Sequence, residues 1–198
     1  PRSTITASGA LAMLFATSPK LAAWALGGIP VAVVPVIAGS GTNDTRRTVE
    51  LTREAARLGA DGALVVTPYY SRPSQEGLFR HFESVAQAAE LPIIIYNVPS
   101  RTAVDIRIET LDRLAHLPGL VGVKDASGDP TRASTMAVRF GDRFTQLSGH
   151  DRSMLAFMAT GGDGAISVVS NVAPMLTAAM IGAVRKSVYL EARRINAH

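Results

Sequence analysis

The alternation of short apolar runs with longer amphipathic stretches constrains the fold of this chain most strongly. From Val33 onward such runs recur six times, and each is followed by a stretch with apolar residues at helical spacing. Continuous apolar runs are typical of strands buried on both faces of a parallel sheet, where neighbouring strands are joined by helical crossovers. The sequence therefore predicts an α/β fold. The predicted strands are Val33–Ala38, Ala63–Thr67, Pro92–Tyr96, Leu120–Lys124, Phe144–Leu147 and Gly164–Val169.

Start and stop signals define the helices between these strands. Asp44 or Thr45 can cap a helix that ends at Gly59, and Ser74 or Gln75 can open the next one. The helix that Ser74 or Gln75 opens is Gly77–Ala89. The further predicted helices are a segment beginning at Ile108, then Thr131–Phe140, Arg152–Thr160, Pro174–Ile181 and Val184–Ala197.

Two architectures fit such a series of β-then-α units. An open doubly wound sheet needs no closure, whereas a TIM barrel needs eight strands and typically about 250 residues. The chain has 198 residues. Six strands in this length exclude a complete barrel but leave an open sheet, or a barrel that lacks its first two units.

The N-terminal stretch differs in composition from the rest. Ser3–Asn43 contains a single charged residue, Lys20. A signal peptide or membrane segment is one interpretation, but Pro30 and the preceding glycines interrupt the apolar run well short of about 20 residues. We interpret residues 1–32 as an atypical segment, arising from a frame error or a truncated end, and residues 33–198 as the folded unit. No membrane partner is expected.

Composition excludes several other classes of function. The chain has no cysteine, which excludes disulfides, zinc–thiolate sites, iron–sulfur clusters and a cysteine nucleophile, and suits a reducing cytoplasm. Twenty basic against 16 acidic residues give a net charge of +4, and the basic residues are scattered, so no nucleic-acid partner is expected. The four histidines lack metal-ligand spacing, and we place His81 and His116 on helix surfaces.

Polar and reactive side chains gather where the predicted strands end, which is where α/β folds bind their ligands. Lys124 ends the run Leu-Val-Gly-Val-Lys. Burial there would lower its pKa, and a neutral amine can form a Schiff base with a ketone. The alternative is a loop lysine paired with Asp125.

Three further strand-end residues suggest chemistry. Tyr96 and Tyr70 could relay protons, although a tyrosine at such a position is more often a packed aromatic side chain with a hydrogen-bonded hydroxyl. Arg101 could hold a carboxylate through two hydrogen bonds, or be an ordinary surface arginine. His150, at the end of the fifth predicted run, has no assigned role.

Taken together, the strand ends resemble the dihydrodipicolinate synthase family of pyruvate-dependent class I lyases. The resemblance covers about Val33–His198, with the motifs in the family's order. The matching stretches are Val34–Thr45, Val66–Gly77, Ile94–Thr102, Val121–Gly128, Leu147–Asp151 and Gly161–Ala173.

The resemblance implies a TIM (β/α)8 barrel represented here by strands 3–8. It also implies that Lys124 forms a Schiff base with pyruvate, which then condenses with L-aspartate 4-semialdehyde to 4-hydroxy-tetrahydrodipicolinate, in lysine and diaminopimelate biosynthesis. No metal or organic cofactor is implied, because the lysine is the electron sink. Another pyruvate-dependent aldolase or hydratase of the superfamily, or an inactive truncated fragment, are the alternatives.

The same resemblance assigns roles to single residues. Tyr96 matches the proton relay, and Tyr70 matches a tyrosine that reaches the active site of a neighbouring subunit, which implies a homotetramer. Arg101 matches the group that holds the semialdehyde carboxylate. Ile166 matches the position whose backbone carbonyl faces pyruvate, and Gly149 would let the backbone approach the ligand.

The sequence departs from the family in three places. Strands 1 and 2, with a Gly-Thr-Thr-Gly-Glu loop that helps to seat pyruvate, are expected to be absent, and Ala7–Ala32 lacks the charged helix expected there. The C-terminal helices are expected to be incomplete. Asn43 matches a residue of the lysine feedback site, but Arg47 stands where an acidic residue is usual.

Overall fold

A parallel sheet of six strands forms the centre of the part of the chain that the computed structural model describes, residues 35–197. Each strand pairs in parallel with the next one in the sequence, from β1 to β6. The strands are β1 (Ile37–Gly39), β2 (Gly62–Val66), β3 (Ile93–Asn97), β4 (Leu120–Asp125), β5 (Thr145–Ser148) and β6 (Gly164–Ala165). The interpretation of residues 1–32 as an atypical segment lies outside the described residues.

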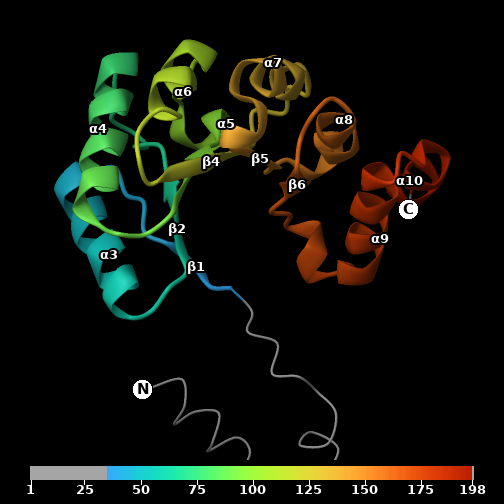
Figure 1. The fold of residues 1–198 in the computed structure, drawn as a ribbon, viewed down its shortest axis with the longest axis horizontal. Helices are drawn as coiled ribbons and strands as arrows, with labels where there is room; N and C mark the ends of the chain where they lie inside the picture. The colour runs from blue at the N-terminus through green and yellow to red at the C-terminus, as the bar shows by residue number, and fades with distance from the viewer. Residues whose placement is uncertain (1–34, 198) are drawn as a thin grey trace, which may run out of the picture. The chain divides into compact units, whose positions relative to one another are not determined.

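The helices lie mostly along the convex side of the curved sheet; those before β6 connect the strands, and the last two follow β6 (Figure 1). They are α3 (Thr45–Arg57), α4 (Gln75–Ala88), α5 (Pro99–Thr102), α6 (Ile108–Leu114), α7 (Thr131–Phe140), α8 (Met154–Ala159), α9 (Pro174–Arg185) and α10 (Tyr189–Asn196), with short 3₁₀ turns η1 (Gly141–Arg143), η2 (Asp151–Ser153) and η3 (Val169–Asn171). The predicted caps are confirmed, since Asp44 accepts from the Arg47 N–H and Ser74 from the Gly77 N–H.

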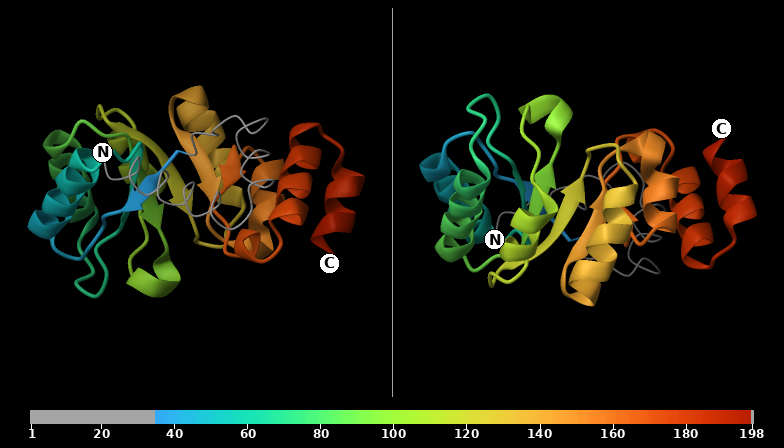
Figure 2. Two further views of the ribbon diagram at one scale, coloured as in Figure 1. Left: turned by 90° about the horizontal axis from the view of Figure 1, so that it is seen from below. Right: turned by 90° about the horizontal axis from the view of Figure 1, so that it is seen from above.

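The strand order decides between the two predicted architectures. In a doubly wound sheet the strand order reverses at a switch point. Here the order follows the sequence throughout, and the chain advances from β1 at one end to the α9–α10 pair at the other (Figure 2). This is the winding of a TIM barrel, and residues 35–197 form a six-stranded partial barrel.

The main core lies between the sheet and its helices. Alternate strand residues such as Val65, Ile95 and Val123 point toward the helices and are fully buried there against side chains that include Phe82 and Met136. Because successive strand side chains alternate between faces, the intervening residues point to the concave side of the sheet. That side carries the candidate site.

The last predicted strand is shorter than expected. Pairing is confined to Leu147 with Gly164 and Ser148 with Ala165, because β5 ends at Ser148 and leaves nothing beyond it to pair with. Ser170 then hydrogen-bonds to the side chain and carbonyl of Ser167, which turns the chain into η3. The prediction of a strand to Val169 was wrong for this reason.

The helix predicted over Val184–Ala197 is also interrupted. α9 runs on to Arg185, and Ser187 then adopts a left-handed conformation with φ of 59°, so α10 begins only at Tyr189. A positive φ at a residue with a side chain ends a helix. The sequence carries no glycine or proline there that would mark the break.

His81 is buried rather than on the helix surface, which overturns the prediction made for it. Only 3% of the residue is exposed, and its Nδ1 lies 2.9 Å from the Thr45 hydroxyl of the neighbouring helix α3. Its position shares the apolar stripe of Leu78, Phe82 and Val85 on α4, so helical spacing already placed it on the inner face. His116 is exposed, as predicted.

Among residues 35–197, none of the helices combines the length and apolar character that a membrane-spanning helix requires.

Candidate active site

Tyr96 and Lys124 stand side by side on the concave face of the sheet. They are register partners on β3 and β4, and the row continues through Val66 on β2 and Leu147 on β5. The sheet register therefore places a phenol next to an amine at the carboxyl ends of two central strands.

The Lys124 amine is buried and lies against the tyrosine. Lys124 is 8% exposed, and its Nζ lies 4.0 Å from the centre of the Tyr96 ring. Within the described residues no carboxylate lies within 4 Å of Nζ. Burial lowers the pKa of Lys124 below its usual 10.5, and the negative charge of Asp151 opposes this shift.

The alternative prediction, a lysine paired with Asp125, is wrong. Asp125 follows Lys124 on the strand, so its side chain points to the opposite, helical face. There it accepts hydrogen bonds from Asn97 and Arg132.

Gly149 makes room for the lysine side chain. It follows β5, and its N–H donates to the Asp125 carbonyl at 2.7 Å. A Cβ at this position would lie 2.8 Å from Cε of Lys124 and 3.0 Å from its Cγ. The absence of a side chain at Gly149 is thus required by Lys124 itself.

A pocket of about 420 Å³ opens beside Tyr96. Arg101 contributes from α5, a single turn that begins at Pro99 and ends at the left-handed Ala103. The pocket brings the predicted residues Tyr96 and Arg101 together. Its lining is Gly39, Gly41, Leu64, Val66, Tyr69, Tyr96, Val98, Arg101 and Thr102.

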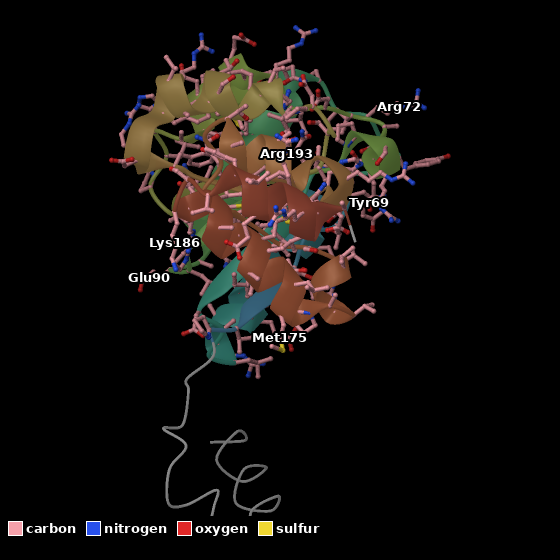
Figure 3. The ribbon with its side chains drawn as sticks, turned by 90° about the vertical axis from the view of Figure 1, so that its right-hand side faces the viewer. Tyr69, Arg72, Glu90, Met175, Lys186 and Arg193 are labelled. Carbon is pink, nitrogen blue, oxygen red and sulfur yellow. The ribbon has the colours of Figure 1, made fainter. Side chains whose placement is uncertain are left out.

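Tyr70 is not part of this pocket. It is 89% exposed and has a positive φ of 69°, and Arg72 nearby in the loop between β2 and α4 has a positive φ of 46°. Its neighbour Tyr69 lines the pocket instead. Figure 3 shows Tyr69 and Arg72 on the same side of the molecule.

Ile166 and His150 flank the site without lining the pocket. The Ile166 N–H donates to the Ser148 carbonyl at 2.9 Å, which places Ile166 next to Gly149. The His150 ring hydrogen-bonds to the Ser153 hydroxyl through Nδ1 and lies close to Gly128.

In the described part of the chain, no group of three or more His, Cys, Asp or Glu side chains is arranged to hold a metal ion.

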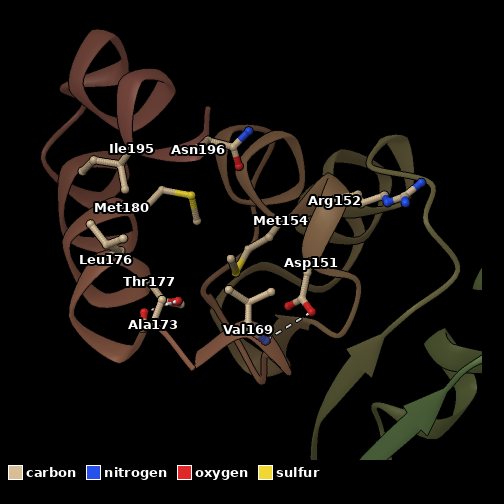
Figure 4. Close-up of a pocket in the computed structure, with 10 residues that line it drawn as sticks. All are labelled: Asp151, Arg152, Met154, Val169, Ala173, Leu176, Thr177, Met180, Ile195 and Asn196. Carbon is tan, nitrogen blue, oxygen red and sulfur yellow. Dashed lines mark hydrogen bonds between the residues drawn. The ribbon is translucent and has the colours of Figure 1, made fainter. Parts of the chain in front are cut away.

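A second pocket, of about 450 Å³, lies among η2, η3, α9 and α10 (Figure 4). Met154, Met180 and Leu176 give it an apolar lining, and Asp151 accepts a hydrogen bond from the Val169 N–H at its edge. None of Lys124, Tyr96 and Arg101 lines it. Although this pocket is similar in size to the first, it is not the candidate active site, because it lacks these residues.

Sequence reasoning missed several residues that shape the site. At Gly41 the chain passes so close to the backbone of β2 that a Cβ would lie 2.3 Å from the Val66 nitrogen. The Gly-Ser-Gly sequence at the end of β1 was the available signal for it. Val98 and Thr102 carried no such signal, because their place in the lining depends on how α5 folds over the strand ends.

The fold and the site together define a class of protein. This is a partial (β/α) barrel whose buried lysine and neighbouring tyrosine stand at the carboxyl ends of its strands, where barrel enzymes carry their reactive groups.

Comparison with known proteins gives the family. The dihydrodipicolinate synthetase family matches residues 31–198, and the chain belongs to this family. It is 51% identical to the 4-hydroxy-tetrahydrodipicolinate synthase of Hyphomonas neptunium, over 83% of this chain and 59% of that protein. It is 53% identical to that of Nitrobacter hamburgensis, over 79% and 53%. These relatives are lyases, and the chain spans little more than half of their length.

Solved structures agree with the fold. The chloride-inhibited dihydrodipicolinate synthase from Acinetobacter baumannii complexed with pyruvate is 43% identical, with a TM-score of 0.81 over 84% of this chain and 57% of that one. Dihydrodipicolinate synthase from Aquifex aeolicus is 44% identical, with a TM-score of 0.81 over 83% and 56%. The prediction of a partial TIM barrel of this family is confirmed.

Proposed function

We propose that this chain carries the Schiff-base site of a lyase that condenses pyruvate with L-aspartate 4-semialdehyde to give 4-hydroxy-tetrahydrodipicolinate, in lysine and diaminopimelate biosynthesis. The observation that carries the proposal is the buried Lys124 amine, free of carboxylate partners within the described residues and seated over Tyr96 beside the pocket of Arg101. The family membership supports the same reaction.

Lys124 is the nucleophile in this proposal. Its neutral amine attacks the ketone carbon of pyruvate, and loss of water leaves a protonated Schiff base. The cationic nitrogen draws electrons from the methyl carbon, which loses a proton to become an enamine. This lysine-bound sink makes a metal or organic cofactor unnecessary. In this proposal Tyr96 carries protons to and from the reacting oxygen, and its position next to Lys124 in the sheet supports that role.

Arg101 selects the second substrate. The enamine carbon attacks the aldehyde carbon of the semialdehyde, and cyclisation follows with release of Lys124. A guanidinium at the pocket wall can bind the semialdehyde carboxylate through two hydrogen bonds. Related aldolases and hydratases share the first half-reaction, so Arg101 is the feature that favours the semialdehyde.

We propose a homotetramer in which Tyr70 serves the site of a neighbouring subunit. Its side chain is almost fully exposed and takes no part in the pocket of its own chain, which supports a role across an interface. Mixing Lys124→Ala chains with Tyr70→Phe chains tests this. Recovered activity is expected, because a mixed interface joins an intact Lys124 to an intact Tyr70. A cytoplasmic location is the remaining prediction.

Trapping with borohydride tests the nucleophile. The chain has three lysines, Lys20, Lys124 and Lys186, so a reduced pyruvyl adduct can be assigned by mass and peptide mapping. We expect one adduct, on Lys124, that is lost in Lys124→Ala and kept in Lys186→Ala. An adduct confined to the other lysines, or none on a folded chain, would refute the proposal. An inactive fragment would then be the better description.

Steady-state rates with different aldehydes test the substrate. Turnover with aspartate semialdehyde is expected to exceed turnover with aldehydes that lack the carboxylate. If trapping succeeds but another aldehyde is preferred, the chain is a sibling aldolase or hydratase of the same superfamily.

A further inference from the structure

The residues directly after Tyr96 and Lys124 are joined to each other behind the sheet. Asn97 and Asp125 are register partners at the ends of β3 and β4, and both are at least 98% buried on the helical face. The Asn97 side-chain amide donates to the Asp125 carboxylate at 3.2 Å. Tyr96 directly precedes Asn97, and Lys124 directly precedes Asp125. A shift of Asn97 relative to Asp125 would therefore also move Tyr96 relative to Lys124.

Arg132, on α7, forms an ion pair with Asp125. Its Nε donates to Asp125 at 2.9 Å, and only 12% of its side chain is exposed. The other carboxylate oxygen of Asp125 accepts from the Ser127 N–H at 2.9 Å. Asp125 is thus a buried charge whose oxygens are held by a guanidinium, an amide and the backbone.

The same arginine holds the segment that follows Arg101. One terminal nitrogen of Arg132 donates to the Ile106 carbonyl at 2.8 Å, and the other lies 3.4 Å from the Asp105 carboxylate. Asn97, on β3, also binds this segment. Its side-chain amide nitrogen donates to the Asp105 carboxylate at 2.7 Å, and its side-chain oxygen accepts from the Ile106 N–H at 3.2 Å. The turn that presents Arg101 is therefore anchored to the ends of β3 and β4.

We propose that Arg132 and Asp125 are positioning residues, which hold Lys124, Tyr96 and the Arg101 turn in one arrangement from behind the sheet. A buried ion pair is a poor source of stability, because desolvation offsets much of its attraction, whereas its directional bonds can specify a geometry. Together with Asn97, this ion pair joins β3, β4, α7 and the segment after α5 through hydrogen bonds. Its role in catalysis rests on the function proposed above.

The variants separate positioning from general stability. Arg132→Met removes the guanidinium and keeps much of the side-chain volume. Arg139→Met is the matched control, because Arg139 lies on the same helix but pairs with Glu109 and Asp112 at the surface. Leu111→Ala is the stability control, since it removes buried core volume and none of the hydrogen bonds of the network.

One readout reports the position of Lys124 without any substrate. In a chain labelled with [13C]lysine, the ring current of Tyr96 should shift the Lys124 CεH2 signal upfield, and Lys124→Arg assigns it. Tyr96→Leu should abolish the shift. We expect the shift to collapse in Arg132→Met and to persist in Arg139→Met and Leu111→Ala.

The second readout is the maximal rate of pyruvate trapping. Displacement of a reacting group by about 1 Å can cost about 100-fold, so we expect Arg132→Met to lose between 10- and 100-fold per folded molecule. The pyruvate concentration for half-maximal trapping should change less. Arg132→Lys restores the charge but not the fork of donors, and should recover only part of the rate.

The outcomes are distinguishable. An unchanged Lys124 shift in folded Arg132→Met would overturn the proposal, as would a rate loss that Leu111→Ala reproduces at equal stability. If the parent chain traps no pyruvate but Arg132→Met still abolishes the shift, the proposed reaction fails while the positioning role of Arg132 stands.

Discussion

The amine of Lys124 lies over the face of Tyr96, with Nζ 4.0 Å from the ring centre. Two effects on the amine oppose each other there. The π face favours the charged ammonium, whereas burial favours the neutral amine and lowers its pKa. Asp151, which lies in η2, favours the charged form as the ring does. The protonation of Lys124 thus depends on identifiable neighbours.

The pH dependence of pyruvate trapping should report this balance. Only the neutral amine reacts, so the rate constant should rise with pH and level off around a midpoint below 10.5, the usual pKa of lysine. Asp151→Asn removes a negative charge that raises the pKa, and should move the midpoint to lower pH. Asp142→Asn, an exposed carboxylate in η1, should leave it unchanged. A midpoint that rises in Asp151→Asn would contradict this account.

The Gly149→Ala variant should impair trapping through steric displacement of Lys124. The added methyl would lie 2.8 Å from Cε, which a buried side chain can relieve only by leaving its place over Tyr96. We expect a loss of at least about tenfold in trapping rate. Gly182→Ala is the matched control, because a Cβ in that α9 position meets nothing within 4 Å. It should keep the trapping rate and leave stability equal or up to about 1 kcal/mol higher.

Local patterns predicted most of this fold. The six β-branched runs and the caps at Asp44 and Ser74 are signals within a few residues of the elements that they mark, and the structure has these elements in place. The errors arise where distant pairing decides. β6 stops at Ala165 because its partner β5 ends, and that cannot be seen in the residues of β6.

The candidate site was also predicted only in part, because some of its residues carry local signals and others are brought together from distant segments. A strand-end position identified Lys124 and Tyr96, and the register made them neighbours. The network behind them was missed because Arg132, Asp105 and Asn97 come from three separate segments. Nothing in the local sequence around any one of them indicates the others. Asp125 illustrates the difficulty. It follows Lys124 in the sequence, which suggested an ion pair between them, but successive strand residues point to opposite faces of the sheet.

Arg101→Ala should separate the two half-reactions. Pyruvate trapping at Lys124 should continue at nearly the parent rate, because in the proposed reaction Arg101 binds the second substrate. Turnover with aspartate semialdehyde should fall by about 100-fold or more, the effect of losing a charge-assisted pair worth about 3 kcal/mol. Arg107→Ala, an exposed arginine before α6, serves as control and should keep both activities. Equal loss of trapping and turnover in Arg101→Ala would instead assign Arg101 to pyruvate.

His81 should make the fold sensitive to acid. Burial lowers its pKa from 6.5 to about 4, against a raising effect of Asp44. Between these pH values the unfolded chain binds a proton that the folded chain excludes, so the free energy of unfolding falls as the pH drops, by up to about 3 kcal/mol. His81→Gln keeps a polar group near Thr45 and should remove this component, whereas His116→Gln, at an exposed position, should not. Urea unfolding at pH 7 and pH 4.5 measures it, and equal acid losses in the parent chain and His81→Gln would show that other groups are responsible.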